Sequence, residues 1–256
     1  MGSIQTKFKN FIESKAFHPP RSRYNENHPR LKILRVNNTK NIATMFYGDA
    51  SYSPNVILYA HGNATDIGYI SDFLQELSQD LNMCICSFDY PGYGLSDGKP
   101  SEWDCYVSIF QVYNYLLEVC KFHPQNIIVY GSSIGTGPAV KLASERLLLG
   151  CILQSPYTSA VATRSRTCAN MMEHSSFLSP DIFVNKHLIK QIRVPLVIIH
   201  GTRDEIIPLS HSEQLIQLTN QPSLLISIKG ANHNDIETHF KNYILEAFQF
   251  ILYNKF

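Results

Sequence analysis

The chain has 256 residues and a mass of 29.1 kDa, and its content of 44% hydrophobic and 17% charged residues is ordinary for a globular protein. This composition excludes intrinsic disorder and fibrous repeats. No run approaches the roughly 20 apolar residues that a membrane-spanning helix needs, and the first residues lack the apolar core of a secretory signal. We therefore expect a cytoplasmic protein, unless a tether holds it to a membrane.

The charge is distributed unevenly along the chain, although the net charge is only +1. Residues 1–35 carry eight of the 22 basic side chains and two of the 21 acidic ones, which leaves the rest with 14 basic and 19 acidic. A body with an excess of acidic residues binds nucleic acid poorly, so no nucleic-acid partner is expected. We treat residues 1–30 as a basic leader and residues 31–256 as the folded domain.

The predicted elements begin with a hairpin of two strands, Leu31–Val36 and Ile42–Tyr47. Short β-branched runs then alternate with segments of helical period, which is typical of βαβ units and a parallel sheet. Residues 156–193 interrupt this alternation and read as a short excursion over the edge of the sheet, with little lid. The expected strands are Val56–Ala60, Met83–Phe88, Ile127–Tyr130, Cys151–Gln154, Leu196–Ile199 and Leu224–Ile228, and the expected helices are Ile67–Leu81, Trp103–Phe122, Ile134–Leu148, Leu209–Leu218 and Ile236–Leu252.

This order of elements predicts an α/β fold with about eight strands in one mostly parallel sheet, flanked by helices. Two local signals support the helix boundaries. Ser101 and Asp104 form a capping pattern before the long helix, and Pro124 is expected to end that helix before the next strand.

Ser133 is the strongest candidate for a catalytic residue. It is the serine of a G-x-S-x-G sequence, Gly131–Gly135, that follows a predicted strand and opens a predicted helix. In that context the serine sits on a strained turn with its hydroxyl exposed, and glycine flanks it because larger side chains would collide with the strand or the helix. A helix-capping serine in a glycine-rich loop is the plainer interpretation, but the strand and helix on either side favour a nucleophile. Ser132, one residue earlier, does not fit the motif.

A serine nucleophile requires a histidine base, which an acid must orient. In this kind of sheet the chain order is serine, acid, histidine. Asp204 follows the strand that ends near Ile199, and His233 lies in the loop after the strand that ends near Ile228. Glu205 is an alternative acid, and Asp235 is interpreted as the cap of the last helix. His200, inside its strand, is expected to be a packed or hydrogen-bonded core residue.

Acyl transfer also requires N–H donors for an oxyanion. The sequence His61-Gly62-Asn63-Ala64 follows a predicted strand, and its glycine allows the backbone to turn the N–H of Asn63 toward the serine. The second expected donor is the N–H of Ile134, at the start of its helix.

Cofactor and metal chemistry have no support in the sequence. There is no G-x-x-x-x-G-K-S/T phosphate-binding loop, and His, Cys and acidic residues do not cluster at the spacing of metal ligands. We therefore expect no cofactor and no metal. The cysteines are expected to be reduced and mostly buried. They are Cys84, Cys86, Cys105, Cys120, Cys151 and Cys168.

Five motifs carry a resemblance to a known family: Leu58–Ala64, Phe88–Ser96, Tyr130–Gly135, Ile198–Glu205 and Gly230–Ile236. With these motifs the chain resembles α/β-hydrolases, specifically the α/β-hydrolase domain-containing protein 17 group of protein depalmitoylases, from about residue 35 to the end. The resemblance assigns the same catalytic triad, Ser133, Asp204 and His233. It implies hydrolysis of palmitoyl thioesters on S-acylated membrane proteins at the cytosolic face of membranes.

The chain departs from that group at its start, because the group is tethered through cysteines near the N-terminus and the first cysteine here is Cys84. A different tether is predicted. Met1–Thr6 fits the pattern for N-myristoylation of Gly2, and a second signal follows it in the leader. Apolar residues fall on one face of a predicted helix with lysines around it, as in helices that lie on the cytosolic leaflet. The apolar residues are Ile4, Phe8, Phe11, Ile12 and Ala16, and the lysines are Lys7, Lys9 and Lys15.

The leader helix packing on the folded domain is the alternative interpretation of this pattern. For the activity, three alternatives to a palmitoyl thioesterase stay open: a carboxylesterase or lipase acting on oxyesters, a serine aminopeptidase, and a binding module that does no chemistry.

Overall fold

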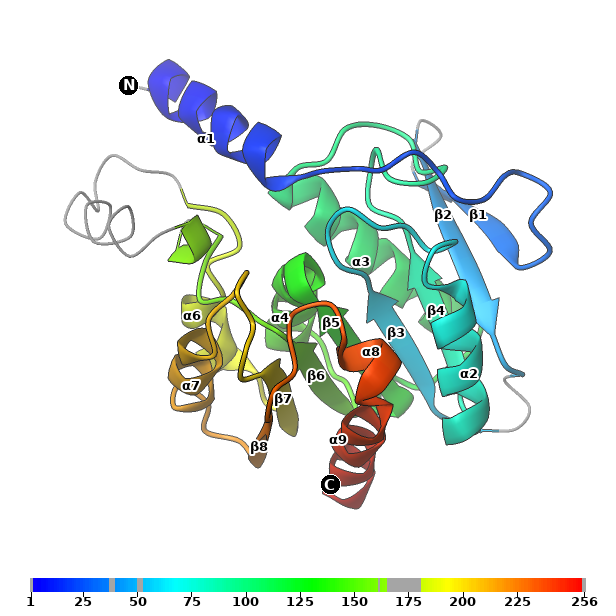
Figure 1. Ribbon diagram of the computed structural model, residues 1–256. Coiled ribbons are helices and arrows are strands. Elements are labelled where there is room, and N and C mark those ends of the chain that lie inside the picture. The colour runs from blue at the N-terminus through cyan, green and yellow to red at the C-terminus, as the bar shows by residue number, and fades with distance from the viewer. Residues whose placement is uncertain (1, 37–39, 50–52, 161, 165–180, 255–256) are drawn as a thin grey trace.

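A computed structural model describes residues 2–36, 40–49, 53–160, 162–164 and 181–254 of the chain, without the side chains of residues 2–8. One sheet of eight strands forms its centre, in the spatial order β1-β2-β4-β3-β5-β6-β7-β8 (Figure 1). The pairs β1/β2 and β2/β4 are antiparallel and every other pair is parallel. The strands are β1 Leu31–Val36, β2 Lys40–Tyr47, β3 Val56–Ala60, β4 Cys84–Phe88, β5 Ile127–Ser132, β6 Gly150–Gln154, β7 Leu196–Gly201 and β8 Ser223–Ile228.

Helices cover both faces of the sheet (Figure 1). Because side chains alternate along a strand, Ile57 and Tyr59 of β3 join one apolar cluster with α2 and α9, whereas Val56 and Leu58 join another with α3 and α4. The α/β fold and the mostly parallel sheet predicted from the sequence are therefore confirmed. The α-helices are α1 Gly2–Ala16, α2 Ser71–Leu81, α3 Glu102–Glu118, α4 Thr136–Glu145, α6 Asn185–Leu188, α7 Ser210–Ile216, α8 Ile236–His239 and α9 Lys241–Tyr253.

Several helix boundaries differ from the predicted ones. The last helix is two helices, α8 and α9, separated at Phe240, whose φ of −128° is not helical. The hydroxyl of Ser101 does accept the backbone N–H of Asp104 at the start of α3. That helix already ends at Glu118, however, and Pro124 starts a 3-10 turn rather than ending α3.

The described part of the excursion packs against the body beside α4. It contains the 3-10 turns Ala162–Arg164 and Ile189–Gln191 and the short helix α6. Ile182, Phe183 and Ile189 are buried in the same cluster as α3 and α4. Residues 161 and 165–180 of the predicted excursion lie outside the described residues.

The cysteines in the described residues are free thiols, and four of them are buried. Burial raises the pKa of Cys84 to about 11 and that of Cys86 well above its ordinary value, so these thiols are unreactive at neutral pH. Cys168 lies outside the described residues. Across the part of the chain that the structure describes, we find no helix with the length and apolar character needed to span a membrane.

Candidate active site

Ser133 occupies the sharp turn between β5 and α4, and its φ of +51° is in the left-handed region that a non-glycine residue rarely adopts. The two flanking glycines are required by close contacts. A Cβ at Gly131 would lie 2.5 Å from the carbonyl oxygen of Gly135, and one at Gly135 would lie 2.1 Å from the carbonyl oxygen of Ala60. The crowded backbone therefore forces glycine at both positions, and Ser133 between them lines the cavity.

The structure brings the three predicted catalytic side chains within hydrogen-bond distance of one another, in the order Ser133, His233, Asp204. Nε2 of His233 lies 2.9 Å from Oγ of Ser133, and Nδ1 of His233 lies 2.7 Å from Oδ2 of Asp204. A carboxylate only accepts hydrogen bonds, so Nδ1 of His233 carries the proton. In a neutral imidazole Nε2 is then free to accept the Ser133 proton, which is the tautomer that a general base needs.

Asp204 is the acid that reaches His233, and the alternative acid Glu205 is exposed beside it. Oδ1 of Asp204 accepts the backbone N–H groups of Ile206, at 2.9 Å, and Ile207, at 2.7 Å. Burial by itself would raise the pKa of Asp204, but the hydrogen bonds from His200, His233 and Ile207 outweigh it and hold that pKa well below its ordinary value. The carboxylate is therefore charged at neutral pH.

His200 does more than fill the core. Its Nε2 lies 2.7 Å from the carbonyl oxygen of Ile207, which can only accept, so Nε2 carries a proton. The same nitrogen is 3.3 Å from Oδ2 of Asp204, and Nδ1 lies 2.6 Å from the hydroxyl of Ser212. His200 and His233 thus contact the same carboxylate oxygen of Asp204, Oδ2, and this support from His200 is a role that the sequence interpretation missed.

Asp235 is the N-cap residue of α8, and its side chain holds the loop that carries His233. Its Oδ1 accepts the backbone N–H of Asn232 at 2.8 Å, and it makes no side-chain cap hydrogen bond to α8. Asp235 therefore lies at the predicted N-cap position, but its carboxylate is used within the loop that precedes the helix.

The predicted oxyanion donors border the same space as the serine. A Cβ built on Gly62 would lie 3.7 Å from Cβ of Ser133, so the loop after β3 approaches the nucleophile closely. Asn63 and Ile134 line one cavity together with Ser133 and His233. The backbone N–H groups of Asn63 and Ile134 remain the predicted oxyanion donors.

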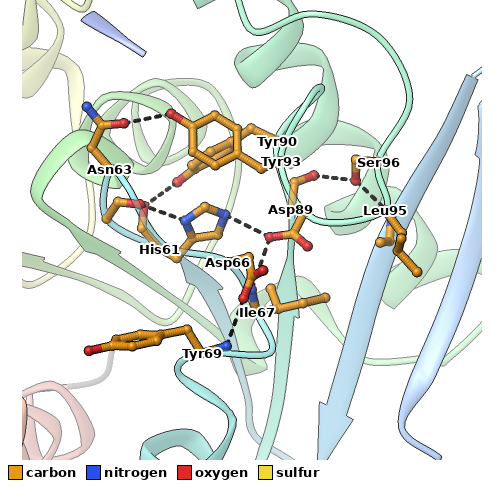
Figure 2. Close-up of polar contacts among 12 residues, drawn as sticks. His61, Asn63, Asp66, Ile67, Tyr69, Asp89, Tyr90, Tyr93, Leu95 and Ser96 are labelled. Atoms are coloured by element: carbon orange, nitrogen blue, oxygen red, sulfur yellow. Dashed lines mark hydrogen bonds and ion pairs between the residues drawn. The ribbon is translucent and has the colours of Figure 1, made fainter. Parts of the chain in front are cut away.

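A buried polar network supports the loop that carries Asn63 (Figure 2). His61 lies between Asp89 and the tyrosines Tyr90 and Tyr93, with its Nε2 3.1 Å from Oδ1 of Asp89. The hydroxyl of Tyr90 donates to the carbonyl oxygen of His61 at 2.7 Å, and that of Tyr93 donates to Oδ1 of Asn63 at 2.6 Å. These contacts anchor both ends of the turn. Asp89 directly follows the buried strand β4 and lies in the Phe88–Ser96 motif, but the sequence analysis assigned it no role.

The cavity beside Ser133 has a volume of about 920 Å³, within the usual range for ligand sites. Its wall is mostly apolar, but Tyr59, Ser132 and Glu237 add polar groups. Oε1 of Glu237 accepts a hydrogen bond from Nε2 of Gln154 at 2.9 Å and lies 3.4 Å from Oγ of Ser132. Burial raises the pKa of Glu237 above its ordinary value. The sequence reasoning did not single out Glu237.

No group of three or more His, Cys, Asp or Glu side chains with metal-binding geometry occurs among the described residues. The side chains gathered at Ser133 are those of acyl transfer: a nucleophile, a histidine base and a carboxylate that orients it. The arrangement can therefore carry out nucleophilic attack on an acyl carbon by the serine hydroxyl.

Comparisons with known proteins agree with this geometry, although no family model matches the chain. The chain is 36% identical over 224 residues to human alpha/beta hydrolase domain-containing protein 17B, and the aligned region covers 86% of this chain and 74% of the relative. It is 32% identical over 233 residues to the Caenorhabditis elegans alpha/beta hydrolase domain-containing protein aho-3, and the aligned region covers 89% of this chain and 67% of that relative.

Solved structures show the same fold at lower identity. An esterase of Pyrococcus furiosus, Pf2001, matches with a TM-score of 0.70 and 17% identity over 92% of this chain and 99% of that one. Mouse alpha/beta hydrolase domain-containing protein 10 matches with a TM-score of 0.63 and 18% identity over 88% and 98%. By its fold and its sequence relatives, the chain belongs to the α/β-hydrolases and, among them, to the alpha/beta hydrolase domain-containing protein 17 family.

Proposed function

We propose that the protein is a serine hydrolase that cleaves palmitoyl thioesters from cysteines of S-acylated membrane proteins at the cytosolic face of a membrane. The observation that carries the proposal is the line of hydrogen bonds from Ser133 through His233 to Asp204, which opens into a mostly apolar cavity. A long acyl group gains free energy by leaving water for such a wall, at about 0.8 kcal/mol for each buried methylene.

The proposed reaction has two stages. Oγ of Ser133 attacks the thioester carbonyl while Nε2 of His233 takes its proton, and the backbone N–H groups of Asn63 and Ile134 receive the negative charge on the oxygen. The C–S bond then breaks, and the cysteine leaves as a thiol after taking the proton from His233. Water attacks the acyl-enzyme with His233 again as the base, which releases the fatty acid and restores Ser133.

Thioesters suit this site because a thiolate leaves more readily than an alkoxide or an amine, so protonation of the leaving group matters less. Hydrolysis of lipid oxyesters is the second candidate, since the apolar cavity would hold an acyl chain of either substrate. A peptidase has less support, because an amine leaving group depends most on proton transfer from His233.

The test compares a palmitoyl-cysteine peptide with a palmitate oxyester of similar length, using the wild-type protein, Ser133→Ala and Ser132→Ala. We expect Ser133→Ala to lose at least about 10³-fold in kcat/KM and all labelling by a fluorophosphonate probe, since Ser133 supplies the hydroxyl that contacts His233. Ser132→Ala is the matched control and should keep its label.

Each outcome of this comparison separates two functions. A strong thioester preference that disappears in Ser133→Ala supports the depalmitoylase. Equal or faster oxyester turnover would make the protein a lipid esterase instead, and retained labelling of Ser133→Ala would refute Ser133 as the nucleophile. Absence of turnover and of labelling in the wild-type protein would favour a binding module.

A further inference from the structure

The leader helix α1 forms one wall of the catalytic cavity. Phe11, Ile12 and Ala16 of α1 line the cavity together with Ser133 and His233. Ile12 is 8% exposed and belongs to the main apolar core, whereas Phe11 is 55% exposed. These three residues belong to the apolar face that the sequence assigned to a membrane surface, so part of that face is turned toward the catalytic cavity instead.

Contacts on both sides hold α1 in this place. Nζ of Lys9 pairs with Oε2 of Glu102 at 2.8 Å, and Oε1 of Glu13 accepts the backbone N–H of Glu102 at 3.0 Å. Beyond the helix, Phe17 is buried and packs edge-on against Phe183, with ring centroids 6.0 Å apart. The second half of α1 is therefore joined to the start of α3 and to the excursion.

The end of α1 is also bonded to the loop that approaches the nucleophile. Nδ2 of Asn63 donates to the carbonyl oxygen of Ala16 at 2.6 Å, and its Oδ1 accepts the backbone N–H of His18 at 3.0 Å. The side-chain amide of Asn63 thus connects α1 to the residue whose backbone N–H is the proposed oxyanion donor. Asn63 therefore positions both the α1 wall of the cavity and the carbonyl group of the bound substrate.

Large apolar side chains that remain partly in water converge on this cavity. Phe11, Tyr69 and Ile206 are 55%, 61% and 54% exposed, and all three line it. They come from α1, the loop before α2 and the loop after β7, which lie far apart in the chain. Exposed apolar surface gathered around one cavity marks a site that an apolar ligand covers.

We propose that α1 is the wall of the acyl-binding site that sets the preference for acyl-chain length, with Phe11 as its specificity-determining residue. This inference rests on the proposed function, because it concerns the acyl group that Ser133 would receive. An acyl chain bound at Ser133 extends along the cavity, and its distal methylenes cover the exposed surface of Phe11. A short acyl group ends before it gains that contact.

The experiment measures kcat/KM on octanoyl and butyryl thioesters of one cysteine peptide, without vesicles, in the full chain and in Phe11→Ala. We expect octanoyl turnover to fall about fivefold while butyryl turnover stays within twofold, because only the longer chain loses apolar contact. Phe11→Leu should recover most of the octanoyl rate. Leu147→Ala is the matched control, since Leu147 is 57% exposed and does not line the cavity.

Three results would overturn the inference. Unchanged turnover of both substrates in Phe11→Ala would show that α1 does not contact the acyl chain. Equal loss on both substrates would show a general effect of the substitution rather than one on acyl-chain length. In both cases wild-type turnover that depends on Ser133 leaves the proposed function standing. An effect of Phe11→Ala only when vesicles are added would assign Phe11 to membrane contact.

Discussion

At the scale of single residues, the carboxylate of Asp204 has four polar partners. It accepts from His233, His200 and two backbone N–H groups, so its carboxylate holds the imidazole in one tautomer. We expect Asp204→Asn to lower kcat/KM by about 10³- to 10⁴-fold, since the amide favours the wrong tautomer of His233. Glu205→Gln is the control next to it and should keep its activity.

The pH dependence of the free energy of unfolding should reflect the ionisation of the Asp204 carboxylate. Because the pKa of Asp204 in the folded protein lies below its ordinary value of 3.8, its ionised form stabilises the fold above about pH 4. That contribution is lost as the pH falls further. The free energy of unfolding of the wild type should therefore exceed that of Asp204→Asn at pH 7, and the difference should shrink below pH 4. A constant difference would contradict this assignment.

The contribution of Glu237 to stability should depend on pH in the opposite direction. Burial raises the pKa of its carboxyl group above the ordinary value of 4.5, so the folded state favours the neutral acid. Its stabilising contribution is present below that value and is lost as the pH rises through the pKa of the folded state. Glu237→Gln stays neutral, and we expect it to gain stability relative to the wild type between pH 4 and pH 8 in urea unfolding. A relative loss over this range would show that the charged form is the favoured one.

At the scale of secondary-structure elements, the turn between β5 and α4 depends on close backbone contact with the end of β3. A Cβ at Gly135 would lie 2.1 Å from the carbonyl oxygen of Ala60, and backbone cannot move aside as a flexible side chain can. We expect Gly135→Ala to lower the free energy of unfolding by about 3 kcal/mol, measured by urea titration.

Gly62→Ala provides the comparison for that measurement. Its added Cβ would approach no atom closer than 3.7 Å, which is ordinary contact, so its free energy of unfolding should change little. Similar losses in the two variants would show that the strain does not come from the contact between Gly135 and Ala60.

At the scale of the whole molecule, part of the leader packs against the folded domain. The hydroxyl of Tyr24 donates to Oδ2 of Asp89 at 2.5 Å, and a Cβ at Gly68 would collide with the ring of Tyr24. Ile12 and Phe17 are buried in the core. Membrane attachment in this arrangement would rely on an acyl group at Gly2 and on the basic side chains near it.

We therefore expect Gly2→Ala to move the protein from the membrane pellet to the supernatant on cell fractionation, because the myristoyl chain cannot be attached without the glycine. One myristoyl chain binds membranes only weakly, so raised salt should also release part of the wild type by weakening the lysine contribution. Ser3→Ala keeps Gly2 and should stay in the pellet. A pellet fraction that Gly2→Ala leaves unchanged would rule out this tether.

The sequence by itself determined the features that depend on neighbouring residues. The alternation of β-branched runs with helical periods predicted the sheet, because side-chain direction follows directly from local backbone geometry. The glycines around Ser133 predicted the turn, because the crowding there lies within a few residues. The contacts that link Asp204 through His233 to Ser133 were predicted from the places of both residues after strands, since the carboxyl ends of parallel strands lie at one edge of the sheet.

Tertiary structure decided which side chains meet across long stretches of chain. His200 completes the support of Asp204, and Tyr24 pairs with Asp89 65 residues away. The apolar face of α1 suits a membrane and a protein surface equally well, and its pattern carries no information about which of the two it meets. Only packing onto Asn63 and Glu102 turned Ile12 toward the cavity, because such contacts depend on where distant elements lie, which local periodicity does not encode.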